Sequence, residues 1–142
     1  MIALGNDHAG YELKNKIADY FKASGIGFKD FGCYSSEAAD YPIYARAVCE
    51  GVLSGEYKAG ILLCNTGTGM TVAANRFKGI RAAICRDERT ATAARDHNDA
   101  NVLVLGAKTT DHGLCMEIIK VFLACPFSNE AKHIKRIQML DS

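Results

Sequence analysis

The sequence predicts an α/β fold: one doubly wound, Rossmann-like sandwich of three layers, with a five-stranded parallel sheet and an extra C-terminal helix. Short apolar runs alternate with longer amphipathic segments along most of the chain. The run Ala59–Cys64 is apolar on both faces, as in the centre of a parallel sheet that helices cover on both sides. Polar, glycine-bearing segments follow the first and third runs, at strand ends where such folds bind ligands.

The N-terminal half supplies three predicted strands and two predicted helices. Residues 2–5 are a short apolar run, and residues 11–24 follow with apolar side chains at helical spacing. Residues 27–31 form a weaker strand, and residues 41–53 repeat the helical spacing. Ala59–Cys64 is the strongest strand of the sequence. This alternation is typical of the βαβ units that build a parallel sheet.

The C-terminal half continues the alternation after a turn with the sequence NTGTG. Six further elements are predicted, namely a helix at 70–76, a strand at 80–85, a helix at 88–97, a strand at 101–105 and helices at 114–123 and 130–140. No repeat, linker or low-complexity tract divides the chain, so residues 1–142 are expected to form a single domain. A chain of this length buries about 70% of its unfolded surface, which suffices for one core.

Composition and charge exclude several classes of function. The formal net charge is +1, which argues against nucleic acid or a membrane surface as a partner, because both favour a basic stripe. No apolar stretch approaches the roughly 18 to 20 residues that span a bilayer, and no signal peptide is expected. The one basic cluster suits a small anion; it comprises Lys132, His133, Lys135 and Arg136.

The cysteine pattern favours free thiols in the cytoplasm. None of the six cysteines forms a CxxC pair, and no His/Cys cluster has the spacing of a zinc site. Most of these cysteines are therefore expected to be small core residues. The sequence predicts no metal and no cofactor, and it predicts a cytoplasmic protein.

Cys64 begins the most informative segment, CNTGTGM. It ends a strand and precedes a glycine-rich turn into a helix, whose positive N-terminus favours a thiolate and binds anions. The N–H groups of the turn could also stabilise a developing enolate oxygen. The other interpretation is a buried structural cysteine before an ordinary turn, and residue chemistry alone does not decide between the two.

Nucleotide binding by this turn is not supported. The turn follows the third strand, not the first, and Val72 stands where a dinucleotide fingerprint has its third glycine. The lysine of a phosphate-binding Walker motif is missing, because Met70 and Thr71 follow Gly69.

Two polar segments carry histidines. Asp7 and His8 follow the first strand, where they could handle a proton or a phosphate, or form only a helix cap with a solvent-facing histidine. His97 and Asn98 precede the last strand, where polar clusters are often turn chemistry. His97 is expected at the opposite end of its strand from the crevice. If His97 is catalytic, a partner chain must supply it.

Taken together, the segments resemble the type B ribose-5-phosphate isomerases and the wider group that includes allose- and galactose-6-phosphate isomerases. The resemblance covers essentially the whole chain, and the order and spacing of its motifs make it specific. The motifs are GNDHAG (5–10), DFG (30–32), DYP (40–42), ILLCNTGTGM (61–70), AAN (73–75), GIRAA (79–83), HNDANVL (97–103) and KHIKR (132–136).

The resemblance implies an aldose–ketose isomerase that interconverts ribose 5-phosphate and ribulose 5-phosphate through an enediolate. Cys64 would carry the proton between C1 and C2, and Thr66 would help to hold the enediolate oxygens. His97 of the partner subunit would open the furanose ring, with Asp7 on the anomeric hydroxyl. The resemblance further implies substrate contacts from His8, Tyr41, Gly67, Thr68, Gly69, Met70, Asn98, Lys108, Lys132 and Arg136; of these, His8, Lys108, Lys132 and Arg136 would grip the phosphate.

The resemblance also implies a homodimer with shared active sites, and leaves open whether dimers pair into tetramers. Lys108 and Lys132 stand where arginine is usual, and Asn65 stands where glycine is usual, so phosphate affinity and substrate size are open. The galactose-6-phosphate enzymes pair unlike subunits, one of which lacks the thiol and the ring-opening histidine. Since this chain keeps both Cys64 and His97, a homodimer acting on a five-carbon sugar is favoured.

Three alternatives remain at this level. One keeps the chemistry and changes the substrate to a six-carbon sugar such as allose 6-phosphate. Another is a non-catalytic phospho-sugar-binding protein, which would have no need of a thiol and a ring-opening histidine together. A Cys–His hydrolase is the least favoured, because the two residues are not expected in one subunit's crevice.

Overall fold

The computed structural model describes residues 1–142. Its strands are β1 (Ile2–Asn6), β2 (Phe28–Asp30), β3 (Ala59–Cys64), β4 (Ala82–Ile84) and β5 (Val102–Gly106), and its helices are α1 (Tyr11–Ser24), α2 (Tyr41–Leu53), α3 (Thr68–Ala74), α4 (Glu88–Asn98), α5 (His112–Ala124) and α6 (Ala131–Gln138). Every predicted element is present, with ends within two residues of the prediction. One element is additional: a short 3-10 helix, η1 (His8–Gly10), which Asp7 caps.

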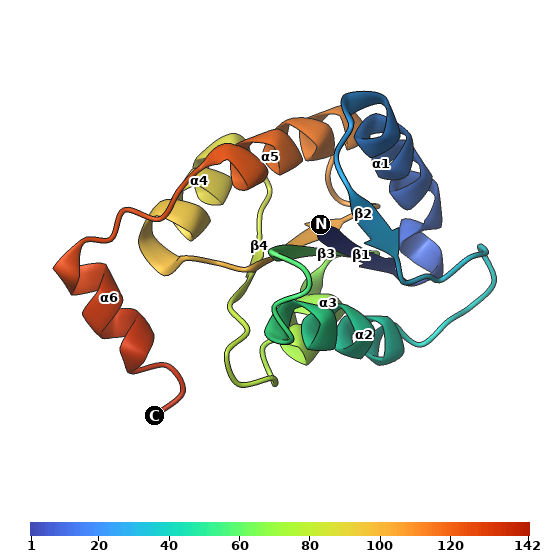
Figure 1. Cartoon of the computed structure of the whole chain (residues 1–142). Coiled ribbons are helices and arrows are strands. Elements are labelled where there is room, and N and C mark those ends of the chain that lie inside the picture. Colours follow the sequence, from blue (N-terminus) through green and yellow to red (C-terminus); the bar gives the residue numbers. More distant parts are fainter.

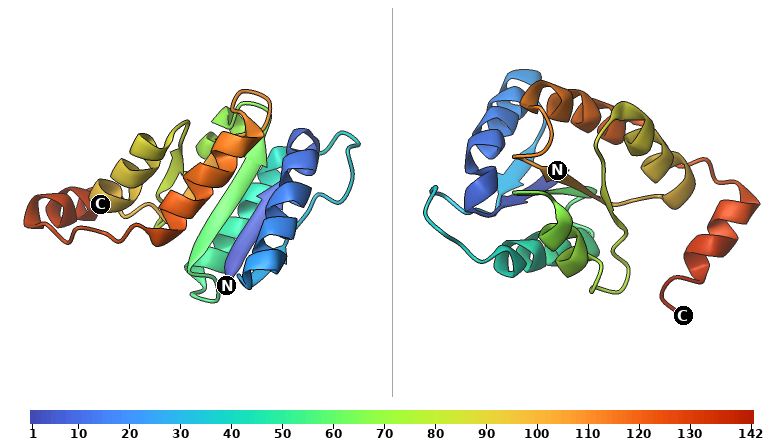
Figure 2. Two further views of the ribbon diagram at one scale, coloured as in Figure 1. Left: turned by 90° about the horizontal axis from the view of Figure 1, so that it is seen from above. Right: turned by 180° about the vertical axis from the view of Figure 1, so that it is seen from behind.

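The five strands form one parallel sheet in the order β2-β1-β3-β5-β4. Helices α1, α4 and α5 cover one face of the sheet, and α2 and α3 cover the other (Figure 1). The views from above and behind show the same three layers (Figure 2). The doubly wound sandwich predicted from the sequence is therefore confirmed. The strand order reverses between β1 and β3, which is where folds of this kind open a crevice beyond the carboxyl ends of the strands.

The core lies on both faces of β3, which is buried at every position. Ile61 and Leu63 pack into the layer of α1, α4 and α5, and Leu62 packs into the layer of α2 and α3. This alternation follows from the two-residue period of a strand. This packing on both faces fixes Cys64, the last residue of β3, at the carboxyl end of the central strand.

Five of the six cysteines are buried, as the sequence predicts for most of them, and three of these have a raised pKa. Burial, together with the smaller effect of the nearby charge of Glu50, raises the pKa of the Cys49 thiol to about 12. Burial likewise raises the pKa values of Cys85 and Cys115 to about 11. These thiols are therefore protonated at neutral pH, and they behave as small apolar side chains.

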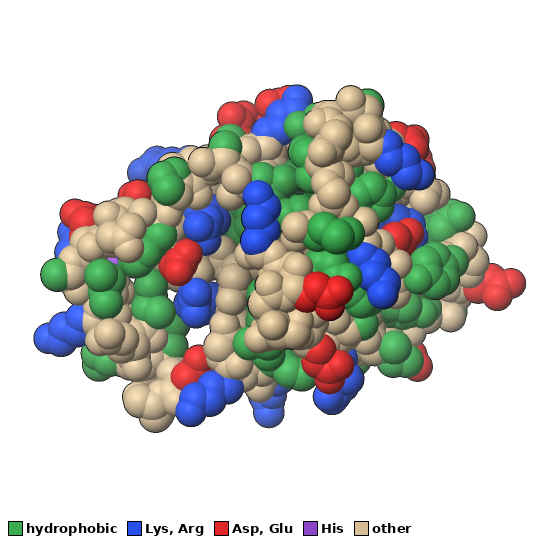
Figure 3. Space-filling view, viewed as in Figure 1, with side chains coloured by type: hydrophobic (Ala, Val, Ile, Leu, Met, Phe, Trp, Pro, Cys, Tyr) green, Lys and Arg blue, Asp and Glu red, His purple; other side chains and the backbone are tan.

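Helix α6 stands apart from the three layers and packs chiefly against α4 (Figures 1 and 2). Its end exposes large apolar side chains, with Met139 at 64% and Leu140 at 62% of full exposure. The surface is hollowed between α6 and the rest of the molecule, and hydrophobic side chains lie beside the hollow (Figure 3). Separately, none of the helices is both long and apolar enough to cross a membrane.

Candidate active site

The loops after β1 and β3 meet at the crevice where the strand order reverses. The Asp7 N–H donates to the carbonyl of Leu63 at 3.1 Å. A Cβ atom at Gly10 would lie 2.7 Å from the Cβ of Leu63, so only glycine lets the first loop come this close. Asp7 is therefore fixed beside the residue that precedes Cys64.

Asp7 both caps a helix and lies at the crevice, so its position is compatible with each of the two roles that the sequence left open. Its carboxylate accepts the Ala9 N–H at 3.0 Å and so caps η1. The same side chain is buried at the crevice, with only 7% of the residue exposed. The neighbouring His8 is exposed, but its Nδ1 accepts the Ala39 N–H at 3.1 Å, which holds the ring against the loop before α2.

Cys64 lies at the carboxyl end of β3, paired with Gly106 of β5 and 5% exposed. Its carbonyl accepts the Ala107 N–H at 2.8 Å. Gly67, in the middle of the turn and at the N-cap of α3, has φ +87°, and a Cβ there would lie 2.6 Å from Ile84. A Cβ at Gly106 would lie 2.6 Å from the carbonyl oxygen of Thr66. The turn is therefore seated directly on β4 and β5, close to the thiol.

The turn presents hydrogen-bond donors next to Cys64. The Thr66 hydroxyl accepts the Thr68 N–H at 3.3 Å, which orders the start of α3. The first N–H groups of a helix have no partner inside it, so those of Gly69 and Met70 are available to an anion. A Cβ at Gly69 would lie 3.0 Å from the ring of Tyr41, so that ring packs on the turn.

A buried lysine anchors the other wall of the crevice. Lys14 is 2% exposed; its ammonium donates to the carbonyl of Cys33 at 2.7 Å and pairs with the Asp30 carboxylate at 2.9 Å. Backbone hydrogen bonds from Asn6 to Gly32 and from Cys33 to Asn6 join the same segment to the end of β1. This network, which the sequence analysis missed, holds the chain beside Asp7. The one feature of the sequence that could have indicated this network is Lys14, a lysine on the apolar face of helix 11–24.

The second group of predicted residues lies elsewhere. His97 and Asn98 end α4, which runs from the carboxyl edge of the sheet back to its amino edge. The length of β5 alone separates the two edges by about 13 Å. The predicted place of His97, at the opposite end of its strand from the crevice, is therefore confirmed. The structure does not bring His97 to Cys64 within one chain.

His97 has its own surroundings. Its ring is about half exposed and stacks on His133 of α6, with ring centroids 4.6 Å apart and planes 19° from parallel. His97 Nε2 also lies 3.3 Å from a carboxylate oxygen of Asp96. A pocket of about 230 Å³ brings His97 and Asn98 together with His133 and Arg136. His133 belongs to the predicted basic cluster, but its contact with His97 depends on how α6 packs and has no local signal.

The four predicted phosphate ligands divide between the two regions. Lys108 follows β5 at the edge that carries Cys64, and its N–H donates to the carbonyl of Asn65 at 3.0 Å. His8 lies at the same edge. Lys132 and Arg136 lie on α6, with the second group. Each region thus combines groups that can move a proton with groups that can bind an anion.

Comparison with known proteins identifies the family. A family model described as Ribose/Galactose Isomerase matches residues 2–140. The chain is 46% identical to a ribose 5-phosphate isomerase RpiB of Thermotoga maritima, whose crystal structure superposes with a TM-score of 0.96 and coverage of 99% of this chain and 96% of that one.

Two curated relatives differ in the sugar that their names give. The chain is 39% identical to ribose-5-phosphate isomerase B of Escherichia coli, over 98% of this chain and 93% of the relative. It is also 39% identical to the galactose-6-phosphate isomerase subunit LacB of Clostridium acetobutylicum, over 99% of this chain and 82% of the relative. This chain belongs to the ribose/galactose isomerase family and is an isomerase.

Proposed function

We propose that this protein interconverts ribose 5-phosphate and ribulose 5-phosphate, with the Cys64 thiolate as the base. The observation that carries the proposal is the Cys64 turn: a thiol, free N–H donors and a buried carboxylate meet where the strand order reverses. The ribose-5-phosphate isomerases among the relatives support this sugar.

The chemistry needs a base and a place for negative charge. Cys64 takes the proton from C2 of the open-chain aldose, the C2–H electrons form the C1=C2 bond, and the electrons of the carbonyl bond move to O1. Cys64 then returns the proton to C1 as the C2 carbonyl forms, and the net transfer of the O2 proton to O1 completes the ketose. The enediolate then carries its charge beside Thr66 and the N–H groups of residues 67–70. Donors of this kind contribute roughly 3 to 4 kcal/mol each in mutational terms, and a positioned base adds about 10²- to 10⁴-fold.

Ring opening is assigned to a second subunit. His97 of the partner subunit protonates the ring oxygen, Asp7 takes the proton of the anomeric hydroxyl, and Asn98 and Tyr41 contact the sugar. Three features support this arrangement: His97 is half exposed, it is distant from Cys64 in its own chain, and α6 exposes apolar side chains next to it. A homodimer would bury these side chains and complete two sites.

Phosphate is held from both sides in the same arrangement. His8 and Lys108 bind it from the Cys64 subunit, and Lys132 and Arg136 from the partner. Lysine binds as a point charge and lacks the planar, paired contact of arginine. We therefore assign to Arg136 the orientation of the phosphate. Six free cysteines fit the reducing cytoplasm that the sequence predicts.

A six-carbon substrate is the second candidate, favoured by the galactose-6-phosphate isomerase relative. Substrate discrimination is the ratio of kcat/KM values, so assays on ribose 5-phosphate, allose 6-phosphate and galactose 6-phosphate decide between the candidates. We expect ribose 5-phosphate to have the highest kcat/KM.

The direct test replaces the thiol. Cys64→Ala should lower turnover of ribose 5-phosphate by at least about 10²-fold, because the base is lost. Thermal unfolding and calorimetric binding of ribose 5-phosphate should change little. The control is Cys125→Ser, which alters a partly exposed thiol far from the turn and should keep full activity. Undiminished turnover in Cys64→Ala would remove Cys64 from the mechanism.

A further inference from the structure

The turn after α4 contains a left-handed aspartate. Asp99 follows Asn98 and has φ 45° and ψ 46°, a conformation that glycine adopts most easily at the end of a helix. An aspartate in this position has a Cβ that disfavours the conformation. The Asp99 carboxylate makes ion pairs that a glycine could not make.

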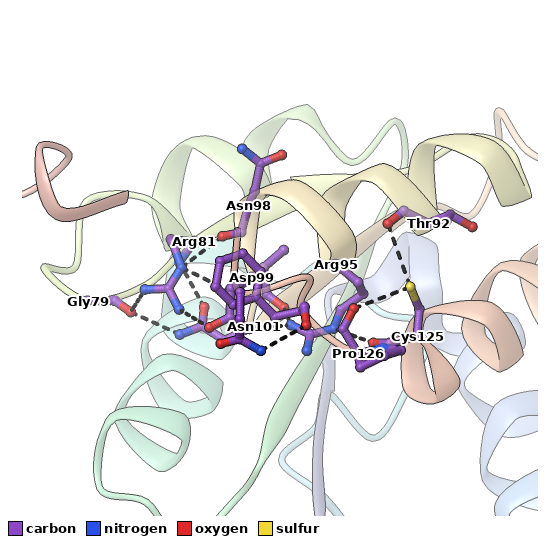
Figure 4. A network of polar contacts seen from close by, with 12 residues as sticks. Gly79, Arg81, Thr92, Arg95, Asn98, Asp99, Asn101, Cys125 and Pro126 are labelled. Carbon is purple, nitrogen blue, oxygen red and sulfur yellow. Dashed lines mark hydrogen bonds and ion pairs between the residues drawn. The ribbon is translucent and has the colours of Figure 1, made fainter. Parts of the chain in front are cut away.

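Two arginines hold Asp99. Arg95 Nη1 lies 2.9 Å from Asp99 Oδ1, and Arg81 Nη2 lies 3.5 Å from Asp99 Oδ2. Both arginine side chains are mostly buried, at 23% exposure for Arg81 and 19% for Arg95. Figure 4 shows Asp99 between them, with the side chain of Asn98 pointing away from the network.

The same arginines bind the backbone on each side of Asp99. Arg81 Nε donates to the carbonyls of Asn98 and Asp99 at 3.1 and 3.0 Å. Arg95 Nη1 donates to the carbonyl of Ala100 at 2.7 Å, and Arg95 Nε donates to that of Cys125 at 3.1 Å. The three consecutive carbonyls of residues 98–100 are thereby bound by Arg81, which immediately precedes β4, and by Arg95 of α4. The end of a helix frays without such contacts.

We propose that Asp99, clamped by Arg81 and Arg95, is a positioning residue that sets the orientation of His97 for ring opening. The proposal rests on the role given to His97 in the proposed function. His97 precedes Asp99 by two residues and is half exposed, so its place depends on the conformation of the turn. A proton donor must be placed to within a fraction of an ångström, and a 1 Å error can cost about 10²-fold.

The test separates ring opening from enolisation. Ribose 5-phosphate closes into a furanose, whereas ribulose 5-phosphate cannot form a five-membered ring because its O5 carries the phosphate. Forward turnover of ribose 5-phosphate therefore needs His97. Exchange of the C1 hydrogen of ribulose 5-phosphate in D₂O needs only the base.

Asp99→Gly keeps the left-handed turn and removes the carboxylate. It should lower forward turnover by about ten- to a hundredfold and C1 exchange by less than about threefold. In a His97→Asn background the same change should lower forward turnover by less than about twofold, because a residue that acts through His97 has no effect without it. Asp99→Asn tolerates the turn and keeps an acceptor for Arg95, so it should recover part of the activity.

Gly25→Ala is the matched control. Gly25 ends α1 with φ +70° and has nothing within 4 Å of its Cβ position, so alanine strains a helix end without touching the site. Its effect should be the same in both backgrounds. The positioning role alone would be overturned if Asp99→Gly lowered ribose 5-phosphate turnover by the same factor with and without His97. It would also be overturned if Asp99→Gly lowered turnover and C1 exchange by the same factor. A His97→Asn enzyme that loses turnover and exchange equally would overturn both this role and ring opening by His97.

Discussion

The Cys64 crevice and the His97 surface are built in different ways. The crevice is made by strand ends and tight turns, and its glycines leave no room for a side chain at Gly10, Gly67 or Gly106. The His97 surface consists of the end of α4 and of α6, a helix that stands apart from the sheet (Figures 1 and 3). The Cys64 crevice is largely buried, and all of its walls come from one chain. The His97 surface is exposed and has apolar side chains without a cover.

This difference suits the two regions to different steps of the proposed reaction, enolisation and ring opening. Enolisation needs a base and donors in fixed positions, which a packed sheet edge supplies. Ring opening needs a group that reaches the ring oxygen. The two histidines at the carboxyl edge of the sheet, His8 and His112, both make hydrogen bonds within the chain. In the function proposed above, the two regions are halves of one site that two subunits complete. Each prediction below tests that division.

The largest effect is expected from mixing two inactive variants. Cys64→Ala and His97→Asn should each lose at least about 10²-fold in ribose 5-phosphate turnover. Refolding or coexpressing them together creates hybrid dimers, in which one site has Cys64 of one chain and His97 of the other. Turnover should return to about a quarter of the wild-type value, because half of the dimers are hybrids with one intact site each.

The same mixture can contradict the division. If Cys64 and His97 of a single chain worked together, every site in every hybrid would lack one of them, and mixing would restore nothing. The control for the refolding step is a mixture of two differently tagged Cys64→Ala chains, which should stay inactive. Size-exclusion chromatography with light scattering confirms that hybrids form.

A moderate effect is expected at His133. Its ring stacks on His97, and its Nε2 lies 3.2 Å from Glu130, so it supports one side of the imidazole that is proposed to open the ring. His133→Ala should lower ribose 5-phosphate turnover by about three- to tenfold while C1 exchange of ribulose 5-phosphate stays near normal. His133→Phe keeps a stacked ring and should restore most of the loss. A phenylalanine variant as slow as the alanine variant would show that stacking is not the support.

The smallest effect concerns α4, the helix that joins the two regions. Its first turn is capped by Asp87, whose carboxylate accepts the Thr90 N–H at 2.7 Å; this bond and the Thr90 hydroxyl lower the pKa of Asp87. A lowered pKa means that the cap stabilises the fold above the ordinary value of 3.8 and that the contribution is lost as pH falls through the folded value.

Asp87→Ala should therefore lower Tm by about 2 to 4 °C at pH 7, and the difference from wild type should shrink in acid below the ordinary pKa of aspartate. Thermal unfolding followed by circular dichroism at pH 7 and at pH 3 measures both. Asp19→Ala, which removes an exposed carboxylate from the middle of α1, is the control and should change Tm little. A difference that grows in acid would contradict the cap.

Most of the fold is predictable from local patterns. The two-residue and helical periods, with the apolar strand Ala59–Cys64, are enough to specify a parallel sheet covered on both faces. The crevice is also predictable, because parallel strands bring the segments after β1 and β3 to the same edge. The ends of the elements and the short helix η1 are harder to predict, since they depend on caps such as that of Asp7.

The rest of the site depends on contacts between distant segments. The stack of His97 on His133 needs the packing of α6 on α4. The left-handed turn at Asp99 is held by Arg81, which immediately precedes β4 and lies 18 residues earlier in the chain. Neither contact has a periodic or local signature. The resemblance to known isomerases suggests roles for these segments, but it does not predict the contacts that hold them.

The buried ammonium of Lys14 has a consequence for how variants of this protein are interpreted. It is matched by the Asp30 carboxylate and a single carbonyl, both within 3 Å. Removing Asp30 would leave an uncompensated charge in the interior, and such losses cost about 3 to 5 kcal/mol. In a living cell, a loss of that size reduces abundance through proteolysis. A growth-based screen would therefore score Lys14 and Asp30 as sensitively as Cys64, although neither one touches a reacting atom.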